Sequence, residues 1–360
     1  MLKERTPLDY ATEAVEMMMR KFKAEDLPPK GDFHYHQGVF LSGVYKNYVL
    51  KGEENWFTYI KDWVDFMVTE CDPQFHHSTG YLDDMQAGIL LFPLYERTKE
   101  LRYKRALDTL MDELRCHPTN KEGGFWHMIR LRDQMWLDGI YMVGPLSCMY
   151  GKVFECPEFF DIAAEQVILM EQKTRDHETG LWYHAYDCER TQSWADKETG
   201  CSEEFWGRSI GWVLVAVLDE LDCIPKDHPQ RDRLEKLVKD LLAAICNYQS
   251  TDGRWYQVVN KGEEKGNWLE NSCSCLYVAA IRKAVRMKIL DKEYLEYARK
   301  GYEGVINSLT WLDGDIQIGQ ICVETGVGDY KYYCDRPVSV NDLHGVGAFL
   351  LMCAEMQMSL

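Results

Sequence analysis

The 360-residue sequence lacks any apolar run long enough to cross a membrane, because a membrane helix needs about 18 or more such residues. The longest candidate, residues 211–218, is far too short. The chain also lacks Pro- or Ser-rich linkers and any long stretch with the alternating pattern of strands. These absences argue against a membrane protein and favour one helical domain over residues 1–360.

Basic residues are fewer than acidic residues. The chain carries 41 Lys and Arg against 58 Asp and Glu, for a net charge of −17. Such a surface repels phosphate backbones and anionic membranes, so we expect neither nucleic acid nor a membrane as a partner. A small anionic ligand is still compatible with this charge, since one buried Arg can outweigh distant surface carboxylates.

The 13 cysteines have no regular framework spacing, and their number is odd. Cys273 and Cys275 form C-x-C, which differs from the C-x-x-C of zinc and redox sites. The first residues contain no apolar segment typical of a secretory signal. Free thiols without an export signal indicate reducing surroundings, so we expect a cytoplasmic protein.

Aromatic residues are abundant, at 12% of the chain with 11 Trp and 21 Tyr. Their flat faces suit sugar rings as well as protein cores. Apolar residues also recur with helical spacing almost throughout. The twelve expected helices are 8–23, 38–50, 54–69, 85–98, 103–116, 134–150, 158–172, 205–221, 231–249, 267–288, 292–309 and 342–358.

A weak internal repeat connects these helices, with a polar residue, often beside an aromatic, before an apolar helix. The marker residues are Asp83, Asp138, Arg208, Ser272 and Asp342. The steps are 55 (83 to 138), 70 (138 to 208), 64 (208 to 272) and 70 (272 to 342). Two helices per step indicate helix hairpins. We expect an all-α fold, an (α/α)6 barrel of six helix hairpins whose polar helix ends share a central pocket; an open helical solenoid is the alternative.

Asp138 lies near a helix start between Trp136 and Tyr141. It suits either an N-cap or an acid in an aromatic pocket. Apolar walls would raise its pKa, while the helix N-terminus would lower it. Asp83 and Asp84 occupy the same slot one repeat earlier, and we expect only one of them to face the pocket, the other being solvated or capping.

Arg208 lies between Trp206 and Trp212. It could grip a carboxylate with two hydrogen bonds while the rings stack on a sugar, or it could be a surface Arg packed on a core Trp. His127 and His184 occur in two aromatic strips, 125–127 and 182–184. Two histidines in similar aromatic settings favour a shared role at the pocket.

His34 and His36 form an H-x-H pair that suits metal binding. No third ligand stands at a recognisable spacing, so we expect no metal site.

Five blocks in collinear order resemble the unsaturated rhamnogalacturonyl hydrolases, glycoside hydrolase family 105. The most specific are W-x-D-G-x-Y-M at 136–142 and W-G-R-x-x-G-W at 206–212. The resemblance implies an (α/α)6 barrel and a cytoplasmic enzyme. Its substrate would be a short oligosaccharide with a Δ4,5-unsaturated uronic acid at the non-reducing end. The other blocks are 82–91, 123–127 and 341–347.

The resemblance also implies the roles of individual residues. Asp138 matches the general acid and base, and Asp83 would be the second catalytic carboxylate, which keeps Asp138 protonated near neutral pH. No cofactor is implied. Met128 stands where relatives acting on rhamnogalacturonan carry a basic residue, and His36 stands where an aromatic is frequent, so the aglycone is left open. The implied substrate-binding residues are His36, His127, His184, Trp206, Arg208 and Trp212.

The implied reaction is hydration of the C4=C5 enol ether, which releases the unsaturated uronic acid, with galacturonyl-rhamnose from rhamnogalacturonan as the expected substrate. Several alternatives stay open. They are an unsaturated glucuronyl hydrolase on another acidic polysaccharide, a conventional glycosidase with two carboxylates, a sugar epimerase that uses His127 and His184, and a non-catalytic sugar-binding scaffold.

Overall fold

Six inner helical segments form a closed ring in the computed structural model, which describes residues 5–69 and 78–360. Each packs against the next, and the last, α13, packs against both α10 and α2. The ring confirms the predicted (α/α)6 barrel. Its members are α2 (Tyr35–Lys51), the 3₁₀ turn η3 (Gln86–Leu90) with α4 (Leu91–Thr98), α6 (Asp138–Val153), α8 (Gly207–Leu221), α10 (Asn271–Arg286) and α13 (Leu343–Gln357).

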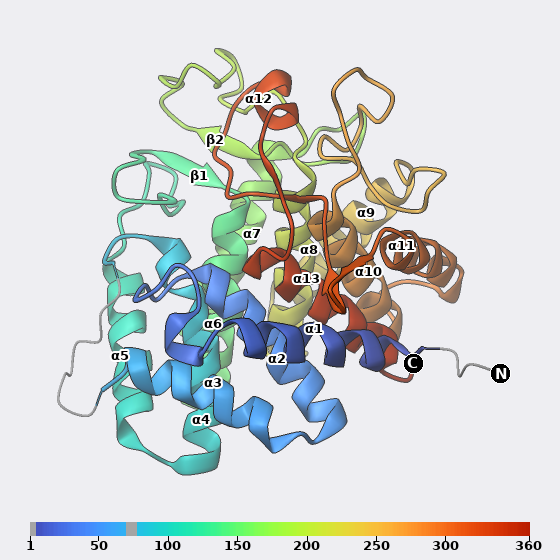
Figure 1. Cartoon of the computed structure of the whole chain (residues 1–360). Coiled ribbons are helices and arrows are strands. Elements are labelled where there is room, and N and C mark those ends of the chain that lie inside the picture. Colours follow the sequence, from blue (N-terminus) through green and yellow to red (C-terminus); the bar gives the residue numbers. More distant parts are fainter. Residues whose placement is uncertain (1–4, 70–77) are drawn as a thin grey trace.

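Six outer helices cover this ring (Figure 1). Each outer helix packs on one or two neighbouring inner helices, for example α7 on α6 and α8. Outer helices such as α9 bury one apolar stripe, whereas α8 is buried nearly all round, as their positions require. The outer helices are α1 (Pro7–Lys21), α3 (Glu54–Met67), α5 (Leu101–Cys116), α7 (Glu158–Thr174), α9 (Arg231–Cys246) and α11 (Leu295–Asn307).

Ring closure depends on a close approach of the first and last inner helices. A Cβ atom added at Gly347 of α13 would lie 2.6 Å from the backbone carbonyl carbon of Val39 in α2. Only glycine allows the two backbones to come this near. Gly347 is therefore required for the packing that closes the ring.

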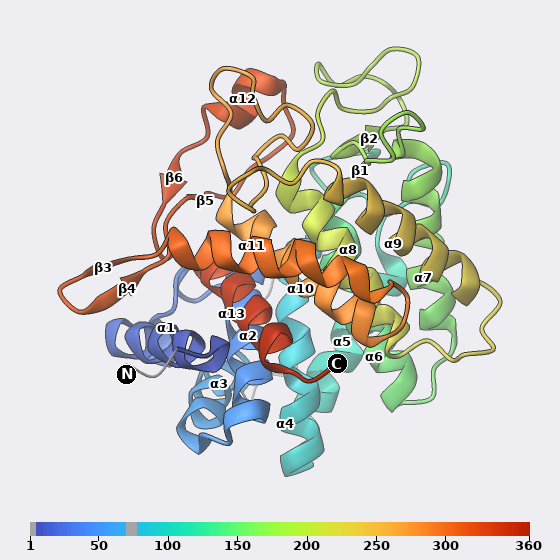
Figure 2. The same cartoon turned by 90° about the vertical axis from the view of Figure 1, so that its right-hand side faces the viewer.

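Short strands and turns join the hairpins at one end of the barrel. Figure 1 shows β1, β2 and the short helix α12 (Tyr330–Cys334) gathered above the barrel, and Figure 2 shows the β3–β4 hairpin projecting from its side. The three antiparallel pairs are β1 (Gln134–Trp136) with β2 (Ala185–Asp187), β3 (Thr310–Leu312) with β4 (Asp315–Gln317), and β5 (Ile321–Cys322) with β6 (Val338–Ser339).

Several predicted boundaries were wrong at the barrel end that carries the site. The helix expected from residue 134 begins at Asp138, because residues 134–136 pair with β2 as a strand. The segment expected as one helix over 85–98 starts as a 3₁₀ turn and becomes α-helical only at Leu91. Within the described residues, no helix is both long and apolar enough to cross a membrane, and the cysteines are free thiols.

Candidate active site

A cavity of about 250 Å³ opens where the inner helices begin. Five predicted site residues meet at its wall: Asp83, His127, Asp138, Trp206 and Arg208. The remaining lining residues are Tyr35, Met128, Arg130, Leu131, Trp136, Met142, Glu324, Thr325 and Gly326.

Asp138 is the first residue of α6 and is 8% exposed. The N-cap of this helix is Leu137, and no side chain caps it, so the capping interpretation of Asp138 was wrong. Its Oδ2 atom lies 3.0 Å from Nε2 of His184, whose Nδ1 lies 2.7 Å from the hydroxyl of Tyr333. Because a carboxylate only accepts, Nε2 donates to Asp138, and Nδ1 accepts from Tyr333.

The protonation states of this pair follow from its surroundings. Burial raises the pKa of Asp138, but the hydrogen bond and charge of His184, with the charges of His127 and Arg208, hold it below its usual value. Burial lowers the pKa of His184, and the charges of His127 and Arg208 lower it further. The hydrogen bond and charge of Asp138 raise this pKa, but they do not outweigh the other effects. In the free site Asp138 is therefore ionised near neutral pH, and the expectation that Asp83 keeps it protonated was wrong.

A second histidine–carboxylate pair lies at the same cavity. Nε2 of His127 is 3.4 Å from Oδ1 of Asp83. Burial lowers the pKa of His127, but the charge and hydrogen bond of Asp83, together with the charges of Asp138 and Glu324, outweigh it and hold the pKa above its usual value. The imidazole also stacks on Trp136, with ring centroids 4.4 Å apart and planes 15° from parallel. This arrangement stabilises a cationic ring in the cavity wall.

Asp83 lines the cavity, whereas the side chain of its neighbour Asp84 does not and lies near His34. Oδ1 of Asp84 lies 3.9 Å from Nε2 of His34. Asp84 is buried, neither solvated nor capping, and burial raises its pKa to about 6. The two adjacent carboxyl groups therefore have different partners, and only Asp83 lines the cavity.

Arg208 is 1% exposed and fixes the segment that crosses the cavity. Its two terminal nitrogens donate to the carbonyl oxygens of Cys322 at 2.6 Å and Val323 at 2.8 Å. Its guanidinium carbon lies 4.5 Å from the ring centroid of Trp206. The interpretation of Arg208 as a surface residue is thus wrong: its side chain lines the cavity, and its Nη1 lies 3.9 Å from Oε1 of buried Glu270.

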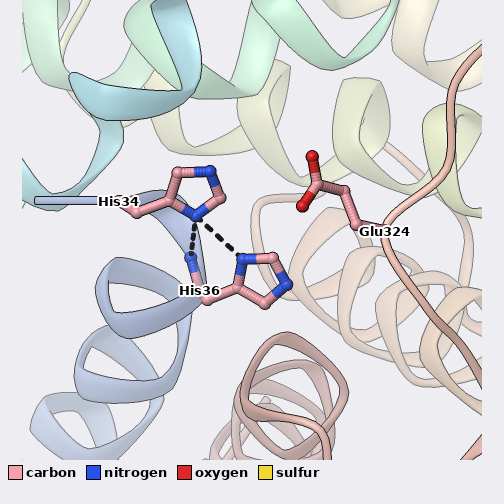
Figure 3. A group of neighbouring side chains, drawn as sticks. All are labelled: His34, His36 and Glu324. Atoms are coloured by element: carbon pink, nitrogen blue, oxygen red, sulfur yellow. Dashed lines mark hydrogen bonds between the residues drawn. The ribbon is translucent and has the colours of Figure 1, made fainter. Parts of the chain in front are cut away.

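Three predicted binding residues do not line the cavity. Trp212 lies further along α8 and stacks on Tyr141 inside the barrel, with centroids 4.7 Å apart. His36 lies beside the cavity, where its Nδ1 is 2.8 Å from Nδ1 of His34 (Figure 3). His184 is fully buried and contacts the site through Asp138.

Sequence reasoning did not assign three residues that build the site. Trp136 stands in the W-x-D-G block, where the sequence analysis gave a role to Asp138 and none to Trp136. Glu324 and Tyr333 lie within residues 310–341, for which the sequence predicted no element, although Tyr333 belongs to α12. This segment is distant in sequence from Asp83 and Asp138, and it lies at the cavity only because of the tertiary fold.

Comparisons with known proteins agree with this architecture. The family model described as Glycosyl Hydrolase Family 88 matches residues 10–360. The solved structure of a glycoside hydrolase from family 105 of C. acetobutylicum is 32% identical, with a TM-score of 0.91, and the match covers 97% of this chain and 99% of that one.

Two further proteins are similar at lower identity. The unsaturated rhamnogalacturonyl hydrolase YesR of Bacillus subtilis is 23% identical over 296 residues, which are 81% of this chain and 79% of that protein. The unsaturated glucuronyl hydrolase of Bacillus sp. GL1 has the same fold, with a TM-score of 0.72 and 14% identity over 98% of this chain and 96% of that one.

Proposed function

The chain belongs to glycosyl hydrolase family 88 and, through its nearly full-length match, to glycoside hydrolase family 105. We propose that it cleaves off the Δ4,5-unsaturated uronyl residue at the non-reducing end of short oligosaccharides, with loss of the C4=C5 double bond. The observation that carries this proposal is the meeting of Asp138, paired with His184, and the Asp83–His127 pair in one small cavity. The expected substrate is unsaturated galacturonyl-rhamnose.

The charges around the cavity suit an anionic sugar. Arg208 and the cationic His127 face it, and they supply local positive potential on a chain whose net charge is −17. The indole of Trp206 offers a flat apolar face for the ring. A cavity of about 250 Å³ accommodates a chain end better than the middle of a polymer.

In the proposed reaction Asp138 donates a proton to C4 of the C4=C5 double bond, and positive charge develops at C5 beside the ring oxygen. Water then adds to C5, and the Asp138 carboxylate takes the proton that the water loses. The hemiketal product opens and frees the aglycone, so one water is consumed. The substrate carboxylate adds negative charge and displaces water beside Asp138, and both changes raise its pKa towards the protonated form that the first step requires.

Rhamnose as the aglycone is supported by the likeness to YesR and by the lining of the cavity. Met128 occupies the position where a basic residue is expected for this substrate. Arg130, two residues further along, also lines the cavity and is held 5.6 Å from the ring centroid of Tyr81. We propose that Arg130 supplies the basic side chain that Met128 does not.

The test follows two signals on matched unsaturated and saturated disaccharides. The conjugated alkene absorbs in the ultraviolet, so turnover should erase this band in step with aglycone release, and the saturated disaccharide should not react. Parallel assays with rhamnose, glucose and amino-sugar aglycones rank the substrates, and rhamnose should give the highest kcat/KM.

Each alternative predicts a different result. A conventional glycosidase would cleave the saturated disaccharide at a comparable rate, which would refute the hydration reaction. An epimerase would release no aglycone and would form a sugar isomer, and a binding scaffold would change neither signal. A clear preference for a glucosyl or amino-sugar aglycone would refute only the choice of rhamnose.

A further inference from the structure

A group of histidine and carboxylate side chains lies beside the cavity and has no part in the proposed reaction. It joins the N-terminal ends of α2 and α13, the first and last helices of the inner ring. Oδ1 of Asp342 lies 2.8 Å from Nδ1 of His344 and 3.8 Å from Nε2 of His36. One atom from each of these three residues lies within 4.8 Å of the other two.

The hydrogen bonds of His344 determine which of its nitrogens carries the proton. Nε2 lies 3.0 Å from the carbonyl oxygen of Cys322, which can only accept, so Nε2 is protonated. In a neutral imidazole Nδ1 then carries a lone pair. This lone pair faces the Asp342 carboxylate, a second acceptor, and the side chain of His344 is fully buried.

The same reasoning applies to His36. Nδ1 of His34 accepts from the backbone N–H of His36 at 3.5 Å, at the start of α2. The same nitrogen lies 2.8 Å from Nδ1 of His36 (dashed lines in Figure 3), and we assign the proton of this contact to His36. Nδ1 of His36 is protonated, and Nε2 has a lone pair that faces Asp342.

Two imidazole nitrogens and one carboxylate oxygen thus face one another within 4.8 Å, a set of donor atoms that suits a bound metal ion. We propose that His36 Nε2, Asp342 Oδ1 and His344 Nδ1 bind one divalent transition-metal ion, with Zn²⁺ as the best match. Imidazole nitrogens favour zinc-like ions, whereas Mg²⁺ and Ca²⁺ prefer oxygen ligands.

The distances and outer contacts agree with this assignment. Zinc bonds of about 2.0–2.1 Å in tetrahedral geometry place ligand atoms roughly 3.4 Å apart. The separations of 2.8 Å and 3.8 Å lie on either side of this value. Metal-bound histidines also usually donate their other N–H group to a carbonyl or a similar acceptor. His344 does so to Cys322, and His36 does so to His34.

A second possible set of ligands shares His36. Figure 3 shows the Glu324 carboxylate near His34 and His36, and one atom of each lies within 4.8 Å of the others. Glu324 is exposed, whereas Asp342 is half-buried and His344 is buried, so we assign the ion to the side of Asp342.

An ion at this position would tie the two ends of the ring together. α2 and α13 belong to the first and last hairpins, and their contact closes the barrel. The ligand His344 also lies near Tyr35 of the cavity wall, with ring centroids 6.1 Å apart. We therefore assign the ion a structural role. The H-x-H spacing could not reveal it, since the other two ligands come from the far end of the chain.

The test uses the full-length protein after treatment with a chelator. Titration of Zn²⁺ in a calorimeter should give one ion per chain and a higher melting temperature, and Co²⁺ should give the absorption of a low-symmetry nitrogen–oxygen site. Asp342→Asn and His36→Gln should each weaken Zn²⁺ binding at least tenfold. Glu324→Gln should bind Zn²⁺ like the wild type, as should His228→Gln, which alters a histidine 3.2 Å from Asp161 far from the site.

Three results would overturn the assignment. The first is a wild-type protein that binds no stoichiometric Zn²⁺, which would mean that a proton on His344 satisfies Asp342. The second is a loss of binding in Glu324→Gln with retention in Asp342→Asn, which would place the ion on the other side of His36. The third is equal loss in His228→Gln, which would mean surface binding. Circular dichroism of each variant checks the fold, and two ligand variants keep the test valid if one does not fold.

Discussion

Two histidine–aspartate pairs lie at one cavity, and the pKa values of their histidines are shifted in opposite directions. His184 contacts Asp138 at 3.0 Å, and His127 contacts Asp83 at 3.4 Å, and both rings are buried. The pKa of His184 is lowered and that of His127 is raised. The residue types and the burial are the same, so neither explains the difference.

The neighbours of each ring explain it. His184 lies near two cations, His127 and Arg208, which oppose its protonation. His127 instead feels the carboxylates of Asp83, Asp138 and Glu324, which favour it. In one pair the carboxylate is held by an imidazole whose surroundings favour the neutral form, and in the other the surroundings favour the cationic form. The comparison teaches that a motif identifies the pair, while the surrounding charges decide its role.

Loss of the carboxylate in the first pair should have the largest effect. We expect Asp138→Asn to fold normally and to lose about a thousandfold in kcat, because general acid–base catalysis contributes roughly 10²–10⁴. The measurement is the initial rate of alkene loss, with circular dichroism as the folding check. Asp84→Asn is the matched control and should retain most activity. Near-normal turnover by folded Asp138→Asn would refute the assignment.

Removal of the carboxylate in the second pair should change the pH dependence. Asp83 holds the pKa of His127 above its usual value against burial, so Asp83→Asn should let burial prevail and lower that pKa. His127 then loses its proton at lower pH, and the alkaline limb of the kcat/KM profile should move to lower pH. We expect a loss of about a hundredfold near neutral pH, within the range for acid–base groups. A profile that moves in Asp84→Asn and stays in place in Asp83→Asn would reverse the assignment.

Loss of the Tyr333 hydroxyl, which contacts His184 of the His184–Asp138 pair, should reduce activity less. Tyr333→Phe removes the donor to Nδ1 of His184 and leaves a buried acceptor unpaired, which costs about 1–3 kcal/mol. We expect kcat to fall about tenfold with little change in KM, because Tyr333 does not line the cavity. Tyr330→Phe, whose hydroxyl bonds to the Lys265 carbonyl, is the control. Equal kinetics in the two variants would show that the contact does not position His184.

We expect the smallest effect from a change of Trp136, whose indole stacks on His127 of the His127–Asp83 pair. Cation–π stacking on Trp is worth about 0.5–2 kcal/mol, and Phe supplies less of it. Trp136→Phe should therefore lower the pKa of His127 in the same direction as Asp83→Asn but by less. Nuclear magnetic resonance titration of the His127 ring compares the two variants directly. A larger change in Trp136→Phe would mean that stacking, not the carboxylate, stabilises the cation.

The sequence by itself determined the barrel and the place of its site. Helical periodicity and a repeated polar residue before alternate helices are local features, so they identified the inner helices and put Asp83, Asp138 and Arg208 at a common end. The family blocks then distinguished Asp83 from Asp84, which spacing alone did not.

Only the tertiary structure decided what these residues do to one another. Tyr333 reaches His184, Arg208 fixes the backbone at Cys322 and Val323, and Trp212 turns into the barrel interior, all through contacts between distant parts of the chain. The proton affinities depend on the same contacts, because a charge acts through its distance and its burial in space. Sequence order contains neither quantity, so the opposite states of the two histidine–aspartate pairs arise only in the closed barrel.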